Sequence, residues 1–164
     1  MKAKNVIVAF VVMMISWLLL NWSFNPIILV VGVILSLAIS VIFCGKCSVF
    51  EGIKITPKAF LYTFIYLFVF IRELIKANID VTKRVLSPTL PINPGIVKIK
   101  TNLKSKMARL ILANSITLTP GTFTVHIEGD FFYIHWISVE AKNIEEATQK
   151  IADTFENILK ELYD

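Results

Sequence analysis

The sequence predicts a membrane α-helical hairpin plus a third amphipathic, embedded helix, followed by a small α+β cytoplasmic domain of order β-α-β-β-α. Three observations lead to this fold class. The chain of 164 residues is 55% apolar with a mean hydropathy of +0.69, which is too apolar for an ordinary soluble domain. Two long uncharged apolar runs lie before residue 44. The C-terminal part instead has alternating runs around a Gly-Asp pair and a closing helical pattern.

The membrane region is expected over residues 1–86, with spans at about 5–21 and 27–43. Each apolar run has roughly the length that crosses the hydrocarbon core of a bilayer. Pro26 ends the break between the runs, because proline disfavours helix in the residue before it. We interpret the first run as an uncleaved anchor and not as a signal peptide, since a second apolar run follows directly.

Charge is distributed unevenly and predicts the topology. Residues 1–86 carry nine basic and three acidic side chains, or +6, whereas residues 87–164 carry eight and nine, or −1. Basic residues lie at the N-terminus and in the loop after the second apolar run. The positive-inside rule therefore places both of these segments in the cytoplasm.

A third helix is expected at about 58–86. Its first half, Ala59–Ile71, is strongly apolar and aromatic but only 13 residues long, which is short for a span. Its second half is charged and keeps an apolar stripe at helical spacing. If the helix crosses the bilayer, the C-terminal domain lies on the opposite side of the membrane from the N-terminus. The charges on one side of the membrane would then violate the positive-inside rule. We expect the other arrangement, in which the helix is interfacial or steeply embedded and its basic residues meet lipid phosphates.

The cytoplasmic α+β domain is expected at residues 96–164, after a Pro-rich linker at 87–95. Its predicted elements are a strand at 96–101, a short basic helix at 103–114, strands at 122–128 and 131–138, and a helix at 143–163. Asn143, with Glu146 three residues later, is typical of the capping box that begins a helix.

The hairpin and the turn before it have specific sequence signals. Gly129-Asp130 is a two-residue link between alternating runs, which favours a β-hairpin. The alternation predicts a core face made of Phe123, Val125, Ile127, Phe132, Ile134 and Trp136. The opposite face is mixed and is expected to meet water, a partner subunit or the membrane surface. Pro120-Gly121 fits the centre of a type II turn, because proline presets φ and glycine takes the positive φ.

Few residues are arranged for chemistry. The first two spans contain no Asp, Glu, Lys, Arg or His, so the chain on its own is not expected to move ions. Cys44 and Cys47 are half of a zinc site at best, and ordinary reduced thiols are expected. His126 and His135 share the mixed hairpin face and would be diagonal neighbours, but exposed histidines with hydrogen-bond partners are commoner than metal pairs. We expect no catalytic residue, no metal, no cofactor and no nucleic-acid ligand.

Two stretches resemble a known family. The run Ser115-Ile116-Thr117-Leu118-Thr119-Pro120-Gly121-Thr122, followed by a hairpin that ends His135-Trp136-Ile137, is similar to the E subunit of the Mrp (Mnh) multisubunit cation/proton antiporters. The upstream run Pro91-Ile92-Asn93-Pro94-Gly95-Ile96-Val97 is similar to the same family, and the resemblance covers nearly the whole chain. It marks eight structural motif positions: Ser115, Thr117, Thr119, Pro120, Gly121, Thr122, His135 and Trp136.

The resemblance implies a non-catalytic accessory subunit that supports assembly of a Na⁺/H⁺ antiporter in a prokaryotic cell membrane. It implies a multi-pass chain with a cytoplasmic C-terminal domain, and three kinds of partner: large multi-helix antiporter subunits, small helical subunits, and membrane lipid. One alternative is the equivalent subunit in the ion-pumping membrane arm of a redox-driven complex, such as a membrane-bound hydrogenase. A further alternative is an independent membrane-anchored domain that binds lipid or a soluble partner.

Overall fold

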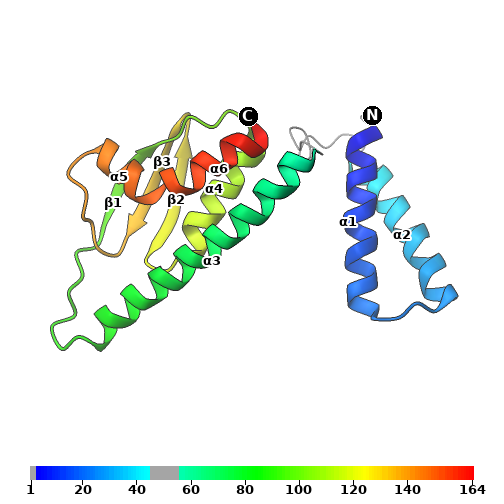
Figure 1. The fold of residues 1–164 in the computed structure, drawn as a ribbon, viewed down its shortest axis with the longest axis horizontal. Coiled ribbons are helices and arrows are strands. Elements are labelled where there is room, and N and C mark those ends of the chain that lie inside the picture. The colour runs from blue at the N-terminus through cyan, green and yellow to red at the C-terminus, as the bar shows by residue number, and fades with distance from the viewer. Residues whose placement is uncertain (1–2, 45–55) are drawn as a thin grey trace. The chain divides into compact units, whose positions relative to one another are not determined.

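The computed structural model of the chain describes residues 3–44 and 56–164, which belong to two compact units divided between Glu51 and Gly52 (Figure 1). The first unit holds helices α1 (Ala3–Asn21) and α2 (Pro26–Cys44). The second unit holds α3 (Pro57–Leu86), β1 (Gly95–Lys100), α4 (Lys106–Leu118), β2 (Thr122–Glu128), β3 (Phe131–Trp136), α5 (Ile144–Ile151) and α6 (Asp153–Tyr163). The thiols of Cys44 and Cys47 lie outside the described side chains.

Helices α1 and α2 meet through small and polar side chains. Ala9 of α1 is 3% exposed, and Ser36 and Ser40 of α2 are 3% and 0% exposed. The Ser40 hydroxyl donates to the Ser36 carbonyl at 2.6 Å, so its polar group is satisfied within α2. The large aliphatic side chains of both helices are exposed on the outside of the pair.

Trp17 holds the hairpin together near the link between its helices. Its indole Nε1 donates to the backbone carbonyl of Ile28 at 3.0 Å. Its ring lies against Gly32 so closely that a Cβ added there would be 2.4 Å from Trp17 Cδ1. Only glycine therefore permits this contact, because any side chain would displace the indole.

Both predicted spans are helices in the structure. Among the described helices, α2 contains an apolar stretch, Pro26–Phe43, that is long enough to cross a membrane. The apolar part of α1, Asn5–Asn21, is shorter. Helix α3 begins at a proline, with Thr56 as its N-cap, whose hydroxyl accepts from Ala59 N at 3.1 Å.

The second unit is layered. Its antiparallel sheet has the strand order β1-β3-β2. Helices α4, α5 and α6 cover one face of this sheet, and α3 packs on α6 (Figure 1). The predicted order β-α-β-β-α is confirmed, with the last helix divided in two. No helix among the described residues covers the other face of the sheet.

The core lies between the sheet and its helices. Ile99 of β1, Phe132 and Ile134 of β3, Leu112 of α4 and Leu159 of α6 are all 0% exposed. Burying each such side chain contributes roughly 1.5–3 kcal/mol relative to leaving it in water. These residues come from every layer, so the core fixes how the helices lie on the sheet.

The predicted helix at 143–163 is wrong in one respect, because it breaks at Ala152 into α5 and α6. The backbone bends there with φ −107°, and Ala152 is 0% exposed at the bend. The bend allows Ala147 of α5 and Phe155 of α6 to reach the same core. The predicted cap is present, since Asn143 Oδ1 accepts from Glu146 N at 2.8 Å.

The predicted hairpin faces are wrong for β2. Phe123, Val125 and Ile127 are 55%, 49% and 41% exposed, although they were expected in the core. The register pairs Thr124 with Ile134, so threonine shares the buried face, and a β-bulge between Thr124 and His126 shifts the rest of the strand. The prediction is correct for β3 at Phe132 and Ile134, whereas Trp136 is only half-buried.

Helix α3 packs on α6 and lies in the same compact unit as the α/β elements. The predicted linker at 87–95 connects α3 to β1 within this unit. Helix α4 begins three residues later and ends four residues later than the predicted 103–114. As a result, the motif residues Ser115 and Thr117 are helical.

Candidate functional site

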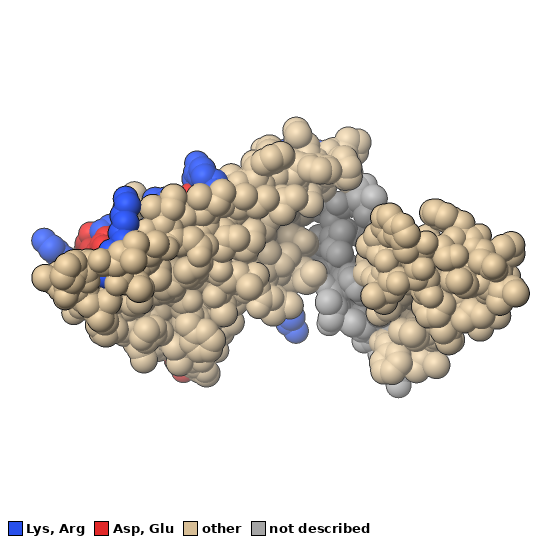
Figure 2. All heavy atoms as spheres, turned by 90° about the horizontal axis from the view of Figure 1, so that it is seen from below, with Lys and Arg blue, Asp and Glu red and all other residues tan. Residues whose placement is uncertain are grey.

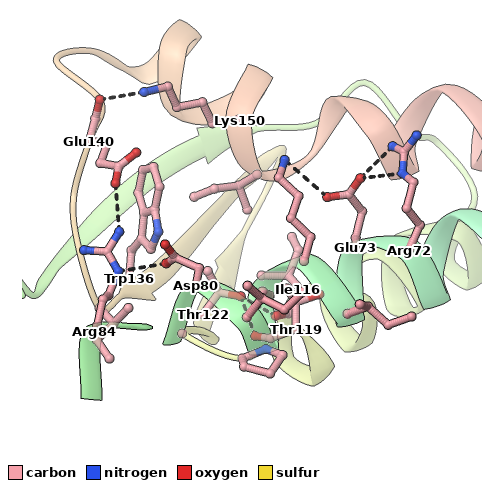
Figure 3. A pocket seen from close by; sticks show the side chains of 18 of the residues that line it. Arg72, Glu73, Asp80, Arg84, Ile116, Thr119, Thr122, Trp136, Glu140 and Lys150 are labelled. Atoms are coloured by element: carbon pink, nitrogen blue, oxygen red, sulfur yellow. Dashed lines mark hydrogen bonds and ion pairs between the residues drawn. The ribbon is translucent and has the colours of Figure 1, made fainter. Parts of the chain in front are cut away.

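A cavity of about 770 Å³ lies in the second unit, between the second half of α3 and the α/β elements (Figure 3). The turn at Thr119–Thr122, Trp136 of β3 and Glu140 contribute to the wall opposite α3. Lys150 and Phe155, from α5 and α6, also line it. This volume lies within the range of small-molecule sites in proteins.

The first half of α3 is anchored to the domain next to this cavity. The hydroxyl of Tyr66 hydrogen-bonds to the hydroxyl of Ser115, which donates in turn to the Ile111 carbonyl at 2.8 Å. Because the Ser115 proton is directed to that carbonyl, Tyr66 is the donor to Ser115. The ring of Phe155 packs against Tyr66 and Phe70 with centroid distances of 6.1 and 6.4 Å.

The turn on the cavity wall has the geometry that its sequence predicts. Gly121 has φ +90°, and Thr122 N donates to the Thr119 carbonyl at 3.2 Å, which closes a type II turn around Pro120. A Cβ added at Gly121 would be 2.9 Å from Ile137 Cγ2. Both the backbone angle and the close approach therefore require glycine at this position.

The hydroxyl groups around the turn are used within the fold. Thr119 Oγ1 donates to the Ser115 carbonyl at 2.8 Å, and Thr122 Oγ1 donates to the Ile116 carbonyl at 2.6 Å. Thr124 Oγ1 donates to the Ala113 carbonyl at 3.1 Å. These carbonyls belong to the last turns of α4, where the carbonyls of Ser115 and Ile116 also accept from Thr119 N and that of Ala113 also accepts from Thr117 Oγ1. The hydroxyls are thus committed to joining α4 to β2 and do not form a phosphate cradle.

The cavity wall carries more positive than negative charge. Five basic residues line it (Arg72, Lys76, Lys83, Arg84 and Lys150), against three acidic ones (Glu73, Asp80 and Glu140), which leaves a net +2. Within this set, Glu73 pairs with Arg72 at 2.6 Å and with Lys76 at the longer distance of 3.8 Å. Lys83 has no ion-pair partner among the described residues.

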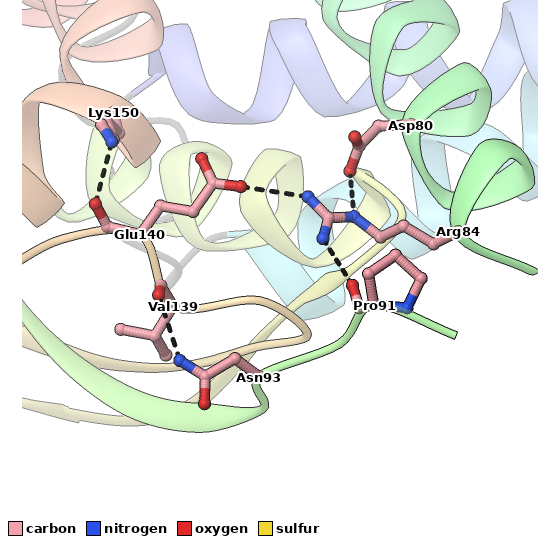
Figure 4. Close-up of polar contacts among 7 residues, drawn as sticks. All are labelled: Asp80, Arg84, Pro91, Asn93, Val139, Glu140 and Lys150. Carbon is pink, nitrogen blue, oxygen red and sulfur yellow. Dashed lines mark hydrogen bonds and ion pairs between the residues drawn. The ribbon is translucent and has the colours of Figure 1, made fainter. Parts of the chain in front are cut away.

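Arg84 connects three segments at one end of the cavity (Figure 4). Its Nε donates to Asp80 Oδ2 at 2.7 Å within α3, and its Nη1 donates to the Pro91 carbonyl of the linker at 2.8 Å. Its Nη2 donates to Glu140 Oε1 at 3.0 Å, in the segment after β3. The side chain is 17% exposed. These three bonds require the planar guanidinium of arginine, which has several N–H donors in a fixed arrangement. The ammonium group of lysine would not supply this arrangement.

The segment after β3 is held from the other side by α5. Lys150 Nζ donates to the Glu140 backbone carbonyl at 2.9 Å and pairs with Glu146 at 3.4 Å. Glu146 Oε2 also accepts from the backbone N–H of Lys142 at 3.0 Å. The N–H of Lys142 lowers the pKa of the Glu146 carboxyl below its ordinary value, and Lys150 lowers it further. Removing Glu146 would therefore loosen the start of α5.

The structure brings most of the motif positions together, but not all. Thr119, Pro120, Gly121, Thr122 and Trp136 line the cavity. Ser115 is buried but does not line the cavity, and the Thr117 hydroxyl accepts from Thr124 N at 3.2 Å. His135 is exposed on the opposite face of the sheet, because neighbouring residues of a strand point in opposite directions.

Sequence reasoning missed the residues that reach this site from α3 and from the segment after β3. Arg84 and Glu140 are separated by 56 residues, so no local pattern links them. The spacing of Asp80 and Arg84 (i, i+4) was the available signal, and it predicts only a surface pair on a helix. His126 lies opposite Tyr133, with a ring distance of 5.9 Å. In the part of the chain that the structure describes, no three His, Cys, Asp or Glu residues are grouped to hold a metal.

The outer side of α3 is apolar. Phe60 and Phe68 are 68% and 70% exposed, and Leu67 is 50% exposed. Figure 2 shows a broad uncharged surface on the second unit, with charged side chains gathered toward one end. Such a large exposed apolar area is typical of a membrane or protein contact surface.

Known proteins resemble this chain over most of its length. A family described as Na⁺/H⁺ ion antiporter subunit matches residues 10–162. The E1 subunit of the Na⁺/H⁺ antiporter of Staphylococcus haemolyticus is 34% identical over 163 residues, which cover 96% of this chain and 94% of that protein. The E subunit of the Na⁺/H⁺ antiporter of Alkalihalophilus pseudofirmus is 44% identical over 93 residues, which cover 57% of this chain and 59% of that protein.

A solved structure is similar at the level of the fold and of the sequence. It is a chain of the membrane-bound sulfane sulfur reductase, an archaeal respiratory membrane complex, with a TM-score of 0.85 and 38% identity. The match covers 97% of this chain and 99% of that chain. Because the family match and the full-length relative both extend through nearly all of these residues, the chain belongs to the family of Na⁺/H⁺ ion antiporter subunits.

Proposed function

We propose that the chain is a non-catalytic accessory subunit of a multisubunit Na⁺/H⁺ antiporter and supports assembly of the ion-translocating complex. The observation that carries this proposal is the exposure of large apolar side chains over α1, α2 and the outer side of α3. These surfaces need lipid or partner subunits to cover them. The full-length relatives are named as subunits of such antiporters, which supports the same function.

Helices α1 and α2 form the membrane hairpin in this proposal. Their interface is made of small and polar residues, among them Gly32, Ser36 and Ser40 at intervals of four, while aliphatic side chains face outward. Leu20 and Ile34, for example, are 83% and 60% exposed. That distribution favours a bilayer as the surrounding solvent, since small residues allow close helix approach where lipid surrounds the pair.

Helix α3 lies in the cytoplasmic interface of the membrane in this proposal. Its first half exposes apolar side chains on the side away from the domain, and its second half carries Arg72, Lys76, Lys83 and Arg84. An amphipathic helix of this kind buries its apolar face at the headgroup boundary. The membrane region is then residues 1–86, with the linker 87–95 leading into a cytoplasmic domain at 96–164. The chain is multi-pass in a prokaryotic cell membrane.

A second candidate function is the equivalent role in a redox-driven membrane complex. The specific observation in its favour is the similarity to a chain of an archaeal respiratory complex, which extends over 97% of this chain with a TM-score of 0.85. In that setting the subunit would still hold the assembly together, and the redox chemistry would belong to other subunits.

Affinity purification of the full chain from its native membrane in mild detergent, with mass spectrometry of the co-purified proteins, tests both candidates. Large multi-helix antiporter subunits without redox proteins are the expected result. Iron–sulfur or hydrogenase-like subunits in the same particle would favour the redox-driven complex. Recovery of the chain alone, as a stable monomer, would contradict both and favour an independent anchored domain.

A further inference from the structure

The cavity beside α3 combines a cationic wall with an apolar one. We propose that it binds one anionic phospholipid, with the headgroup phosphate at Lys76 and Lys83 and the acyl region over Ile75 and Ile79. This proposal rests on the proposed interfacial position of α3, which places its charged half at the level of the headgroups.

The charge of the cavity favours an anion. Its lining has two more basic than acidic side chains. Arg84 already donates to three acceptors, so it is committed to the fold. Lys83 has no ion-pair partner among the described residues, and Lys76 lies 3.8 Å from Glu73 and is 79% exposed. These two lysines are therefore the cations available to a headgroup phosphate. Basic pockets on the cytoplasmic side of membrane proteins bind anionic headgroups in this way.

The shape and apolar lining favour a lipid over a free anion. Ile116, Trp136 and Ile151 line the domain side of the cavity, and Ile75 and Ile79 line the α3 side. Both of these α3 residues are also more than half exposed, at 55% and 51%. The apolar lining is thus continuous with the exposed apolar side of α3, so an acyl chain could leave the cavity along a surface that we place in the bilayer. The half-buried indole of Trp136 suits the boundary between acyl and polar regions.

Native mass spectrometry of the full chain in mild detergent tests the site, with phosphatidylglycerol and phosphatidylcholine of identical acyl chains added separately. The wild-type chain is expected to retain one phosphatidylglycerol in preference to phosphatidylcholine. Each lysine contributes roughly fivefold to the affinity for an anionic lipid surface. The double variant K76Q/K83Q is therefore expected to lose about 25-fold in affinity for phosphatidylglycerol.

The matched control is K98Q/K100Q, which removes two lysines from the outer sheet face, outside the cavity. It is expected to keep the preference for phosphatidylglycerol. A circular-dichroism melt should show that both double variants fold like the wild type. Equal retention of the two lipids by the wild-type chain, or equal loss in both double variants, would overturn the proposal.

Two further readouts separate the lipid from other occupants. Millimolar inorganic phosphate is not expected to displace the lipid, and displacement would show that the site takes a free anion. The intact complex is expected to retain the lipid, and its loss on assembly would show that a protein segment fills the cavity. The subunits that co-purify with wild-type chain report on the proposed function separately, so failure of one proposal is distinguishable from failure of the other.

Discussion

Arg84 of α3 and Glu140 of the segment after β3 form an ion pair with Nη2 and Oε1 3.0 Å apart, although 56 residues separate them in the chain. The same guanidinium also donates to Asp80 and to the Pro91 carbonyl. One side chain therefore joins the end of α3, the linker and the α/β elements. The linker needs this support, because Leu90 holds the uncommon φ of +42°.

Replacing Arg84 by methionine is expected to lower the free energy of unfolding of the second unit by about 1–2 kcal/mol, because three hydrogen bonds are lost. Hydrogen–deuterium exchange should rise in the linker around Pro91. Arg72→Gln is the control, since Arg72 is 67% exposed and pairs with its neighbour Glu73. The control should change stability by less than about 0.5 kcal/mol. An unchanged rate of hydrogen–deuterium exchange in the linker of Arg84→Met would show that the Arg84 side chain does not hold the linker.

Gly121→Ala and Gly129→Ala are expected to differ in a urea-unfolding measurement. Both glycines have positive φ, +90° and +54°, so each alanine costs about 1–2 kcal/mol in backbone strain. At Gly121 the new Cβ also meets Ile137 Cγ2 at 2.9 Å, whereas nothing lies within 4 Å at Gly129. Gly121→Ala should therefore be the more damaging. Equal losses would mean that Ile137 moves aside freely.

Gly32→Val is expected to expel Trp17 from its place in the hairpin, because even a Cβ would lie 2.4 Å from the indole. In a background with Trp22 and Trp136 changed to phenylalanine, Trp17 becomes the fluorescent reporter. Its quenching by brominated phospholipids should increase in Gly32→Val. Val31→Leu, at a position that is 40% exposed, should leave quenching unchanged. Equal quenching in all three proteins would argue against the Trp17–Gly32 contact.

The stability of the second unit should depend on pH through Glu146. Its carboxyl pKa is lowered from the ordinary value of 4.5, chiefly by the Lys142 N–H and then by Lys150. A lowered pKa stabilises the fold above the unfolded pKa, and the effect is lost as pH falls through the folded pKa. Glu146→Gln should thus melt at a lower temperature than the wild type at neutral pH, and the gap should close as the pH falls below 4.5 through the lowered pKa of the folded state. Glu145→Gln is the control from the same turn, and a similar pH-dependent gap there would contradict the assignment.

Local chemistry was sufficient to predict much of this fold. The link Gly129-Asp130, the turn at Pro120-Gly121 and the cap at Asn143 depend on residues that are close in sequence, and the structure has all three features. Helical periodicity located α3 within one residue at its start and correctly at its end. Of the residues that line the candidate site, the sequence predicted only the turn at Thr119–Thr122 and Trp136, because these residues belong to one sequence pattern.

Tertiary structure decided the features that depend on distant contacts. The β-bulge and the bonds from Thr122 and Thr124 to α4 turned Phe123 and Val125 outward, where alternation alone predicted a core. Packing on α6 made α3 part of the α/β unit, and it brought Arg84 and Glu140 together at one end of the cavity across 56 residues. The sequence by itself determined the elements, the turns and the apolar character of this chain. Only the fold determined which apolar side chains remain exposed, since exposure depends on what each face packs against.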